Sequence, residues 1–388
     1  MKRIIRISFS LAAVVLLGTS CSKTFLDTNP NYLKPTSEVF SDIAGAEGAI
    51  NGLCRLMTSE YGDLDGGSGE GAILNYYGNY PGNDFQKCNR TGMNGVMSGS
   101  YHMLLDSAYD YYPWHYYFMI IMNANQILAN IDNIDGKGVN IDAQKDFIKA
   151  QALVFRSYSF FRLSELYCNR WEDAKKADNT YTYTDIKGDE HTFSGEGAVR
   201  GLPLRLDLST GDIPCSALIE VKDQIYKDLD EAIEKFTLSG LQRKSDEYFK
   251  PDKRVAYAIY ARAALTYQDW PTAAKYARLA RENMELMSND EYLNGGFNSA
   301  NCETIWGTYD AIDQNLSSRS FFNYMASNGS SLNCRTYPAA ISKQLYDQIP
   351  VGDIRRQLFL EPTPEEVMDP KFDKTTGRFA GAPTACST

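Results

Sequence analysis

The sequence predicts a mostly α-helical protein with long irregular loops and little β-structure. Several segments repeat apolar residues at three- and four-residue steps, and the segments between them are rich in Gly, Asn, Asp and Ser. The composition, 43% hydrophobic and 23% charged over 388 residues, is ordinary for a folded protein. The net charge of −10 argues against a nucleic-acid partner, because phosphate backbones are bound by clustered Lys and Arg.

Four long segments have helical periodicity. They are residues 36–58, 114–135, 143–170 and 216–237, and the last repeats its apolar side chains at four-residue steps. We interpret 143–170 and 216–237 as one helical hairpin, interrupted by the polar segment 172–214. That insertion shows no helical periodicity, so we expect a loop there.

Residues 252–286 give the clearest supersecondary signal. Two apolar helical stretches are joined by the turn DWP, with Pro271 well placed in the first turn of the second helix. Counted as a tetratricopeptide unit, the small positions fall on Ala261, Ala273 and Ala280. Small side chains there let two paired helices approach closely, so we predict a tetratricopeptide-like helical pair.

Loop-rich segments are expected near residues 59–113, 172–214 and 290–350. The first includes NYYGNYPGNDF, in which Gly and Asn exclude a regular helix. Loops of this length are usually functional or disordered, and the interleaved tyrosines argue against disorder.

The N-terminus predicts export and lipid anchoring. Three basic residues precede the apolar run 7–18, which is shorter than the roughly 20 residues that span a bilayer. The box LGTSC resembles a bacterial lipoprotein signal, with the leucine one position further back than usual. We therefore assign residues 1–20 to a lipoprotein signal peptide, Cys21 to lipid attachment, and residues 21–388 to a single domain. The alternative is a periplasmic protein with a free thiol near its start.

No motif predicts a metal, a cofactor or catalysis. The cysteines form no C-x-x-C pair, and the three histidines are far apart in the sequence. Asp228 and Asp230 form an acidic pair, but carboxylates two residues apart on a helix point in different directions. We expect a binding protein rather than an enzyme.

Nine motifs in order resemble the SusD/RagB family of nutrient-binding lipoproteins of the outer membrane. They extend over about 340 residues, too many in the right order to expect by chance. They are Cys followed by FLD (25–27), AEGAINGL (46–53), MNANQIL (122–128), KAQALVFRSYSFFRLSELY (149–167), GLPL (201–204), IYKDLDEAI (225–233), the D-W-x-x-A turn, ETIW (303–306) and GDIRRQLF (352–359).

The resemblance implies a function and a place in the cell. It implies a lipid-anchored subunit at the exterior face of a Gram-negative outer membrane, acting as a lid on a SusC-like TonB-dependent transporter. The ligand would be an oligosaccharide, or a peptide in RagB-like members. The family's usual W/F-P-I-P-x-x-E motif is missing after GDIRRQLF, so we expect either a truncated or a diverged C-terminal region.

Candidate ligand-binding residues follow from the chemistry of sugars. Flat aromatic faces contact the C–H side of a sugar ring, and polar groups bind its hydroxyls. Two clusters combine these features; the alternative for both is packing of loops on the body. The candidates are Tyr76, Tyr77, Tyr80, Asn83, Asp84 and Phe85 in the first cluster, and Trp306 and Tyr309 in the second.

Overall fold

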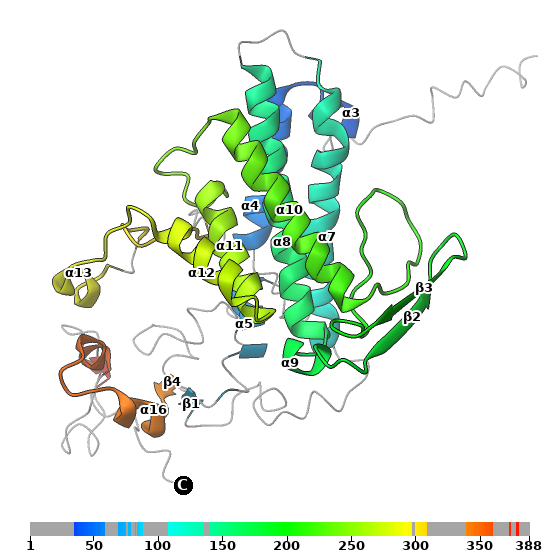
Figure 1. Cartoon of the computed structure of the whole chain (residues 1–388). Helices are drawn as coiled ribbons and strands as arrows, with labels where there is room; N and C mark the ends of the chain where they lie inside the picture. The colour runs from blue at the N-terminus through cyan, green and yellow to red at the C-terminus, as the bar shows by residue number, and fades with distance from the viewer. Residues whose placement is uncertain are drawn as a thin grey trace, which may run out of the picture.

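Helices dominate the structure, a computed structural model, which confirms the predicted fold class (Figure 1). The residues that it describes are 35–58, 69–74, 77–78, 82, 84–87, 108–135, 140–296, 299–308, 339–359, 372–373 and 378–379. The predicted signal peptide, Cys21, Tyr76, Tyr80, Asn83 and Tyr309 lie outside these residues.

Three long helices run side by side and form the centre of the molecule (Figure 1). They are α7 (Ala108–Asn130), α8 (Ile141–Tyr167) and α10 (Leu218–Ser239), and α4 (Ile43–Thr58) packs against α7 and α8. Helix α8 is buried on nearly all sides along its second half, as expected for a helix whose apolar residues surround it. The short helices α3 (Thr36–Val39) and η3 (Ile131–Asn133) adjoin α4 and α7.

Local residues set the two ends of α10, and α7 begins earlier than the sequence predicted. The Glu220 carboxylate accepts a hydrogen bond from the Ala217 N–H (2.9 Å), and Gly240 ends α10 with a left-handed φ of 61°. Helix α7 begins at Ala108 rather than at the predicted residue 114, so Pro113 lies inside it. Pro113 lies beyond the first turn and has no N–H to donate to the carbonyl four residues earlier, so α7 continues through it with one helical hydrogen bond fewer.

The predicted helical pair at 252–286 is present as α11 (Lys253–Thr266) and α12 (Trp270–Arg281). Asp252 and Asp269 cap the two helices, accepting hydrogen bonds from the N–H groups of Val255 (2.9 Å) and Thr272 (3.3 Å). Ala273 and Ala280 are buried at the helix–helix contact. The pair packs on α10 through α11, so α8, α10, α11 and α12 form successive layers.

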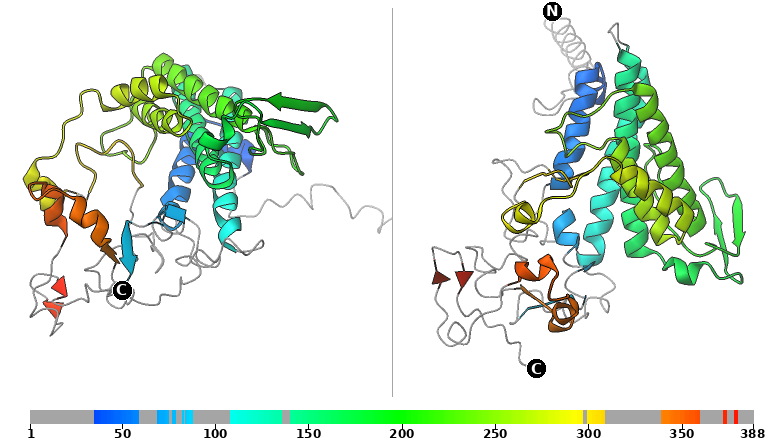
Figure 2. Two further views of the ribbon diagram at one scale, coloured as in Figure 1. Left: turned by 60° about the horizontal axis from the view of Figure 1, so that its bottom comes forward. Right: turned by 60° about the vertical axis from the view of Figure 1, so that its left-hand side comes forward.

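The segment 172–214 contains a β-hairpin that the helical pattern did not reveal. After α9 (Trp171–Ala174), strands β2 (Thr180–Thr184) and β3 (Glu190–Ser194) pair antiparallel and project from the helices (Figures 1 and 2). Threonine and tyrosine alternate along β2, so one face is aromatic and the other is exposed. The Tyr181 hydroxyl donates to the Cys215 carbonyl (3.0 Å), which fastens the aromatic face to the segment before α10.

The remaining elements are short. Strand β1 (Phe85–Lys87) pairs antiparallel with β4 (Ala339–Ile341) and joins two segments far apart in the sequence (Figure 2). The others are α5 (Glu70–Leu74), α13 (Asn289–Leu293), α16 (Lys343–Gln348), η4 (Ile354–Leu358), β5 (Phe372–Asp373) and β6 (Arg378–Phe379).

A charged network lies inside the helical core. The Arg156 guanidinium on α8 donates to both carboxylate oxygens of Asp228 on α10 (2.7 and 2.8 Å) and to the Asn125 amide oxygen on α7 (3.0 Å). All three side chains are buried, and Gln224 donates a further hydrogen bond to Asp228 (2.7 Å). The Asn125 amide nitrogen donates to the carbonyls of Arg205 and Asp207, so the network also holds the loop before α10.

Candidate functional site

Trp306 lies at the boundary between the helical core and the segment 299–308. Its indole N–H donates to the Phe249 carbonyl (2.9 Å), and its ring meets those of Phe155 and Tyr158 edge-on, at 5.8 and 5.3 Å between centroids. The side chain is half-buried. One part of the ring therefore packs on α8, and the other part is in contact with solvent.

Helix α5 is fixed to the long helices through Glu70, its first residue. The Glu70 carboxylate accepts hydrogen bonds from the Tyr117 hydroxyl (3.0 and 3.1 Å) and from the Tyr158 hydroxyl. The Arg162 Nε lies 3.6 Å from the same carboxylate, and the Arg162 guanidinium also pairs with Glu165. Together with the completely buried Ile73, these contacts hold α5 against α7 and α8.

The environment of this cluster keeps its tyrosines protonated. Burial raises the pKa of both Tyr117 and Tyr158 well above the usual value, and the nearby Glu70 charge raises each pKa further. Both hydroxyls therefore act as donors to the carboxylate at neutral pH.

The first candidate cluster is divided between two places in the described chain. Tyr77 follows α5, is half-buried and packs against the core. Asp84 is exposed, and its carbonyl accepts a hydrogen bond from the Ser342 N–H (2.8 Å) beside the β1–β4 pair, where Phe85 begins β1. Tyr77 and Trp306 thus both pack on the helical core, whereas Asp84 and Phe85 lie at the small sheet.

The sequence did not indicate Glu70, Tyr158 or Arg162 as part of a site. Tyr158 and Arg162 lie in a helix whose apolar pattern predicts only core. Glu70 follows a glycine-rich stretch, and an acidic residue before a short apolar run is a weak helix-start signal. Only their packing in space brings the three together.

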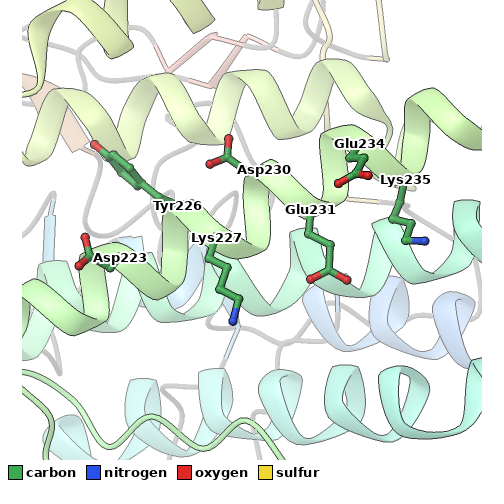
Figure 3. Close-up of a pocket in the computed structure, with 7 residues that line it drawn as sticks. All are labelled: Asp223, Tyr226, Lys227, Asp230, Glu231, Glu234 and Lys235. Carbon is green, nitrogen blue, oxygen red and sulfur yellow. The ribbon is translucent and has the colours of Figure 1, made fainter.

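An open hollow of about 610 Å³ runs along α10 (Figure 3). Its lining contains none of the candidate ligand-binding residues predicted from the sequence, and two of its charged side chains contact residues of other helices. Asp230 accepts long hydrogen bonds from Tyr260 (3.3 Å) and Tyr276 (3.5 Å), and Lys235 donates to Asp146 (2.8 Å). All of its lining residues belong to α10, so the hollow is a polar surface of that helix. Its lining residues are Asp223, Tyr226, Lys227, Asp230, Glu231, Glu234 and Lys235.

The described residues contain neither a metal-ligand cluster nor a membrane-spanning helix. Within the described part of the chain, His, Cys, Asp and Glu side chains form no group of three or more that could hold a metal ion. No helix in the same residues combines the length and apolarity needed to cross a membrane.

Comparison with protein families gives a match over residues 78–265. The matching model describes SusD-like proteins: starch-binding, associating with outer membrane. This part of the chain is similar to SusD-like proteins. The matched region begins directly after Tyr77 and includes α7, α8, α10 and most of α11. A search of the curated proteins finds no match.

Solved structures of SusD-like proteins share the fold. A SusD-like carbohydrate binding protein from Bacteroides vulgatus is 23% identical, with a TM-score of 0.63 over 82% of this chain and 60% of the other. A SusD superfamily protein from the same species is 20% identical, with a TM-score of 0.62 and coverages of 83% and 66%. One from Bacteroides thetaiotaomicron is 18% identical, with a TM-score of 0.61 and coverages of 81% and 64%. The chain thus spans less than two thirds of each of these three structures.

Proposed function

We propose that this SusD-like chain is a cell-surface lipoprotein that binds a nutrient glycan and delivers it to a SusC-like TonB-dependent transporter. The observation that carries the proposal is the match of residues 78–265 to a family of starch-binding proteins that associate with the outer membrane. We also propose that the chain binds this ligand without catalysing a reaction on it.

The arrangement of aromatic residues supports glycan binding. Tyr77 and Trp306 are each half-buried, so the core fixes one part of the side chain while another part remains accessible. Rings held in this way lose little conformational entropy when a sugar stacks on them. We propose that the segment from Tyr76 to Phe85, together with Trp306 and Tyr309, forms the ligand-facing surface.

Glycan binding can be tested by calorimetric titration with a panel of oligosaccharides that includes maltoheptaose, a starch fragment. We expect Tyr76→Ala and Tyr80→Ala each to weaken binding of the recognised sugar roughly tenfold, because one aromatic contact is lost. Tyr111→Ala is the matched control, since Tyr111 is 56% exposed on α7 and outside the proposed surface. If peptides bind and no sugar does, the RagB-like alternative is correct instead.

Lipid attachment makes a separate prediction. Cys21→Ala should move the protein from the membrane fraction to the soluble fraction, because the acyl chains supply the membrane affinity. Cys302→Ala removes an exposed thiol elsewhere and should leave the distribution unchanged. The measurement is immunoblotting of the two fractions, with a radiolabelled fatty acid to detect acylation. A Cys21→Ala protein that stays in the membrane fraction would contradict the assignment.

The exterior location and the transporter partner need their own measurements. Protease added to intact cells should digest the native protein if it faces the exterior. The transporter should co-purify with the chain after mild detergent extraction. Protection from protease in intact cells would exclude the proposed orientation.

A further inference from the structure

One side chain of α8 contacts both segments that carry the proposed ligand-binding residues. The Tyr158 hydroxyl donates to Glu70 at the start of α5, and α5 leads directly toward Tyr77. The ring of Tyr158 lies 5.3 Å from the Trp306 ring between centroids, at an interplanar angle of 82°. Tyr158 is only 6% exposed, so α8 fixes its orientation.

Helix α5 depends on these contacts for its position. It has five residues, and an isolated helix of that length is not stable in water. Its charged anchor is Glu70, which is bonded by Tyr117 on α7 and Tyr158 on α8, with Arg162 Nε at 3.6 Å. Its apolar anchor is Ile73, which is completely buried.

We propose that Glu70 is a positioning residue. Through Tyr158 it holds α5 and the Trp306 segment in one fixed relative arrangement, so that Tyr77 and Trp306 meet a ligand as a single preorganised surface. The identity of the ligand rests on the proposed function. The contacts from Glu70 through Tyr158 to Trp306 do not depend on that function.

If the hydrogen bonds of Glu70 contributed only to global stability, their loss would change amide hydrogen exchange in a different pattern. A hydrogen bond that contributes only to global stability changes the opening of all cooperative core elements equally. A hydrogen bond that fixes a peripheral segment changes the local opening of that segment and leaves the central helices unaffected. Amide hydrogen exchange measured peptide by peptide separates the two cases.

The experiment compares the full chain with its Glu70→Gln and Tyr158→Phe variants by hydrogen exchange and mass spectrometry. We expect about tenfold faster exchange in peptides covering residues 69–78 and 299–308, because Tyr158→Phe removes a hydrogen bond to a charged group and Glu70→Gln replaces the charged acceptor by a neutral one. Peptides from α10 should exchange at the rate of the unmodified protein. Equal acceleration in α10, acceleration in only one of the two segments, or no acceleration would overturn the proposal.

Tyr267→Phe is the matched control. Tyr267 is buried, and its hydroxyl shares a hydrogen bond with Ser164 on α8 (2.8 Å). The substitution therefore removes a buried tyrosine hydroxyl that contacts α8 from the end of α11, without touching Glu70 or Trp306. It should leave exchange in residues 69–78 and 299–308 unchanged.

A binding measurement with maltoheptaose completes the test. Glu70→Gln and Tyr158→Phe should weaken its binding about tenfold, and Tyr267→Phe should not. If the unmodified protein does not bind maltoheptaose, the starch-like ligand is wrong, and the exchange measurements still decide the role of Glu70. If maltoheptaose binds and both variants retain full affinity, Glu70 does not position the ligand surface.

Discussion

Replacing Asp228 with alanine is expected to lower the free energy of unfolding by about 3–5 kcal/mol. Asp228 is 1% exposed and accepts two hydrogen bonds from the Arg156 guanidinium, at 2.7 and 2.8 Å. Without it, the guanidinium stays buried between α7, α8 and α10 with no anionic partner among the described residues. An uncompensated buried charge costs far more than the intact pair contributes.

The effect should also reach the loop before α10. Asn125 accepts a hydrogen bond from Arg156 and donates to the carbonyls of Arg205 and Asp207. If Arg156 turns toward another acceptor, Asn125 loses one of its fixed contacts, and the loop loses its attachment to α7. The expected loss therefore lies toward the upper end of the range.

Asp230→Ala is the control for this prediction. Asp230 lies two residues further along α10, is exposed, and accepts only long hydrogen bonds of 3.3 and 3.5 Å from Tyr260 and Tyr276. Its replacement should cost less than about 1 kcal/mol. Urea unfolding followed by circular dichroism measures both, with an unchanged m-value as the sign of a pure stability effect. Equal losses for the two variants would contradict the role assigned to the buried network.

The helical scaffold was readable from local patterns. The periodicity of residues 143–170 and 216–237 and the DWP turn correspond to α8, α10 and the α11–α12 pair. These signals are local because a helix places residues three and four apart on one face. The start of α7 was predicted too late, because the helical pattern was followed only from residue 114, whereas the helix begins at Ala108.

The β-hairpin was missed for a different reason. Residues 180–184 read TYTYT, an alternation typical of a strand, but the run is only five residues long and lies within a polar segment. Its partner strand, 190–194, reads EHTFS and alternates less clearly. Pairing of the two strands buries part of the aromatic face, and neither strand would be stable alone.

The candidate site was predicted only in outline. Tyr77 and Trp306 stand out because aromatic residues in polar segments are unusual, but the connection between them is not local. Glu70 and Tyr158 meet because α5 packs on α8, and Trp306 meets Tyr158 from a segment far later in the chain. No spacing in one sequence encodes such contacts, which depend on how the helices pack.

Alkaline pH is expected to unfold the protein through its buried tyrosines. Burial raises the pKa of Tyr117, Tyr158 and Tyr267 above the usual value of about 10, and the Glu70 charge adds to the effect for the first two. In the unfolded chain these groups ionise near pH 10, so above that pH the unfolded state binds fewer protons than the folded state. Stability therefore falls as pH rises.

The size of the effect follows from linkage. Between about pH 10 and the raised folded pKa, each such tyrosine lowers the free energy of unfolding by about 1.4 kcal/mol per pH unit. Three together give about 4 kcal/mol per pH unit, enough to unfold a domain of ordinary stability within two or three pH units. Below about pH 9 the same groups are protonated in both states and contribute no slope.

The measurement is unfolding free energy against pH, combined with the near-ultraviolet absorbance of tyrosinate. Tyr267→Phe should make the alkaline slope shallower by about 1.4 kcal/mol per pH unit, because one buried group no longer gains from ionising in the unfolded chain. Tyr111→Phe should leave the slope unchanged, since that side chain is 56% exposed in the folded protein. If tyrosinate absorbance rises fully while the helices remain intact, burial does not protect these hydroxyls. A tyrosinate signal that appears together with loss of helix means that the packing of α5, α7, α8 and α11 keeps these tyrosines protonated.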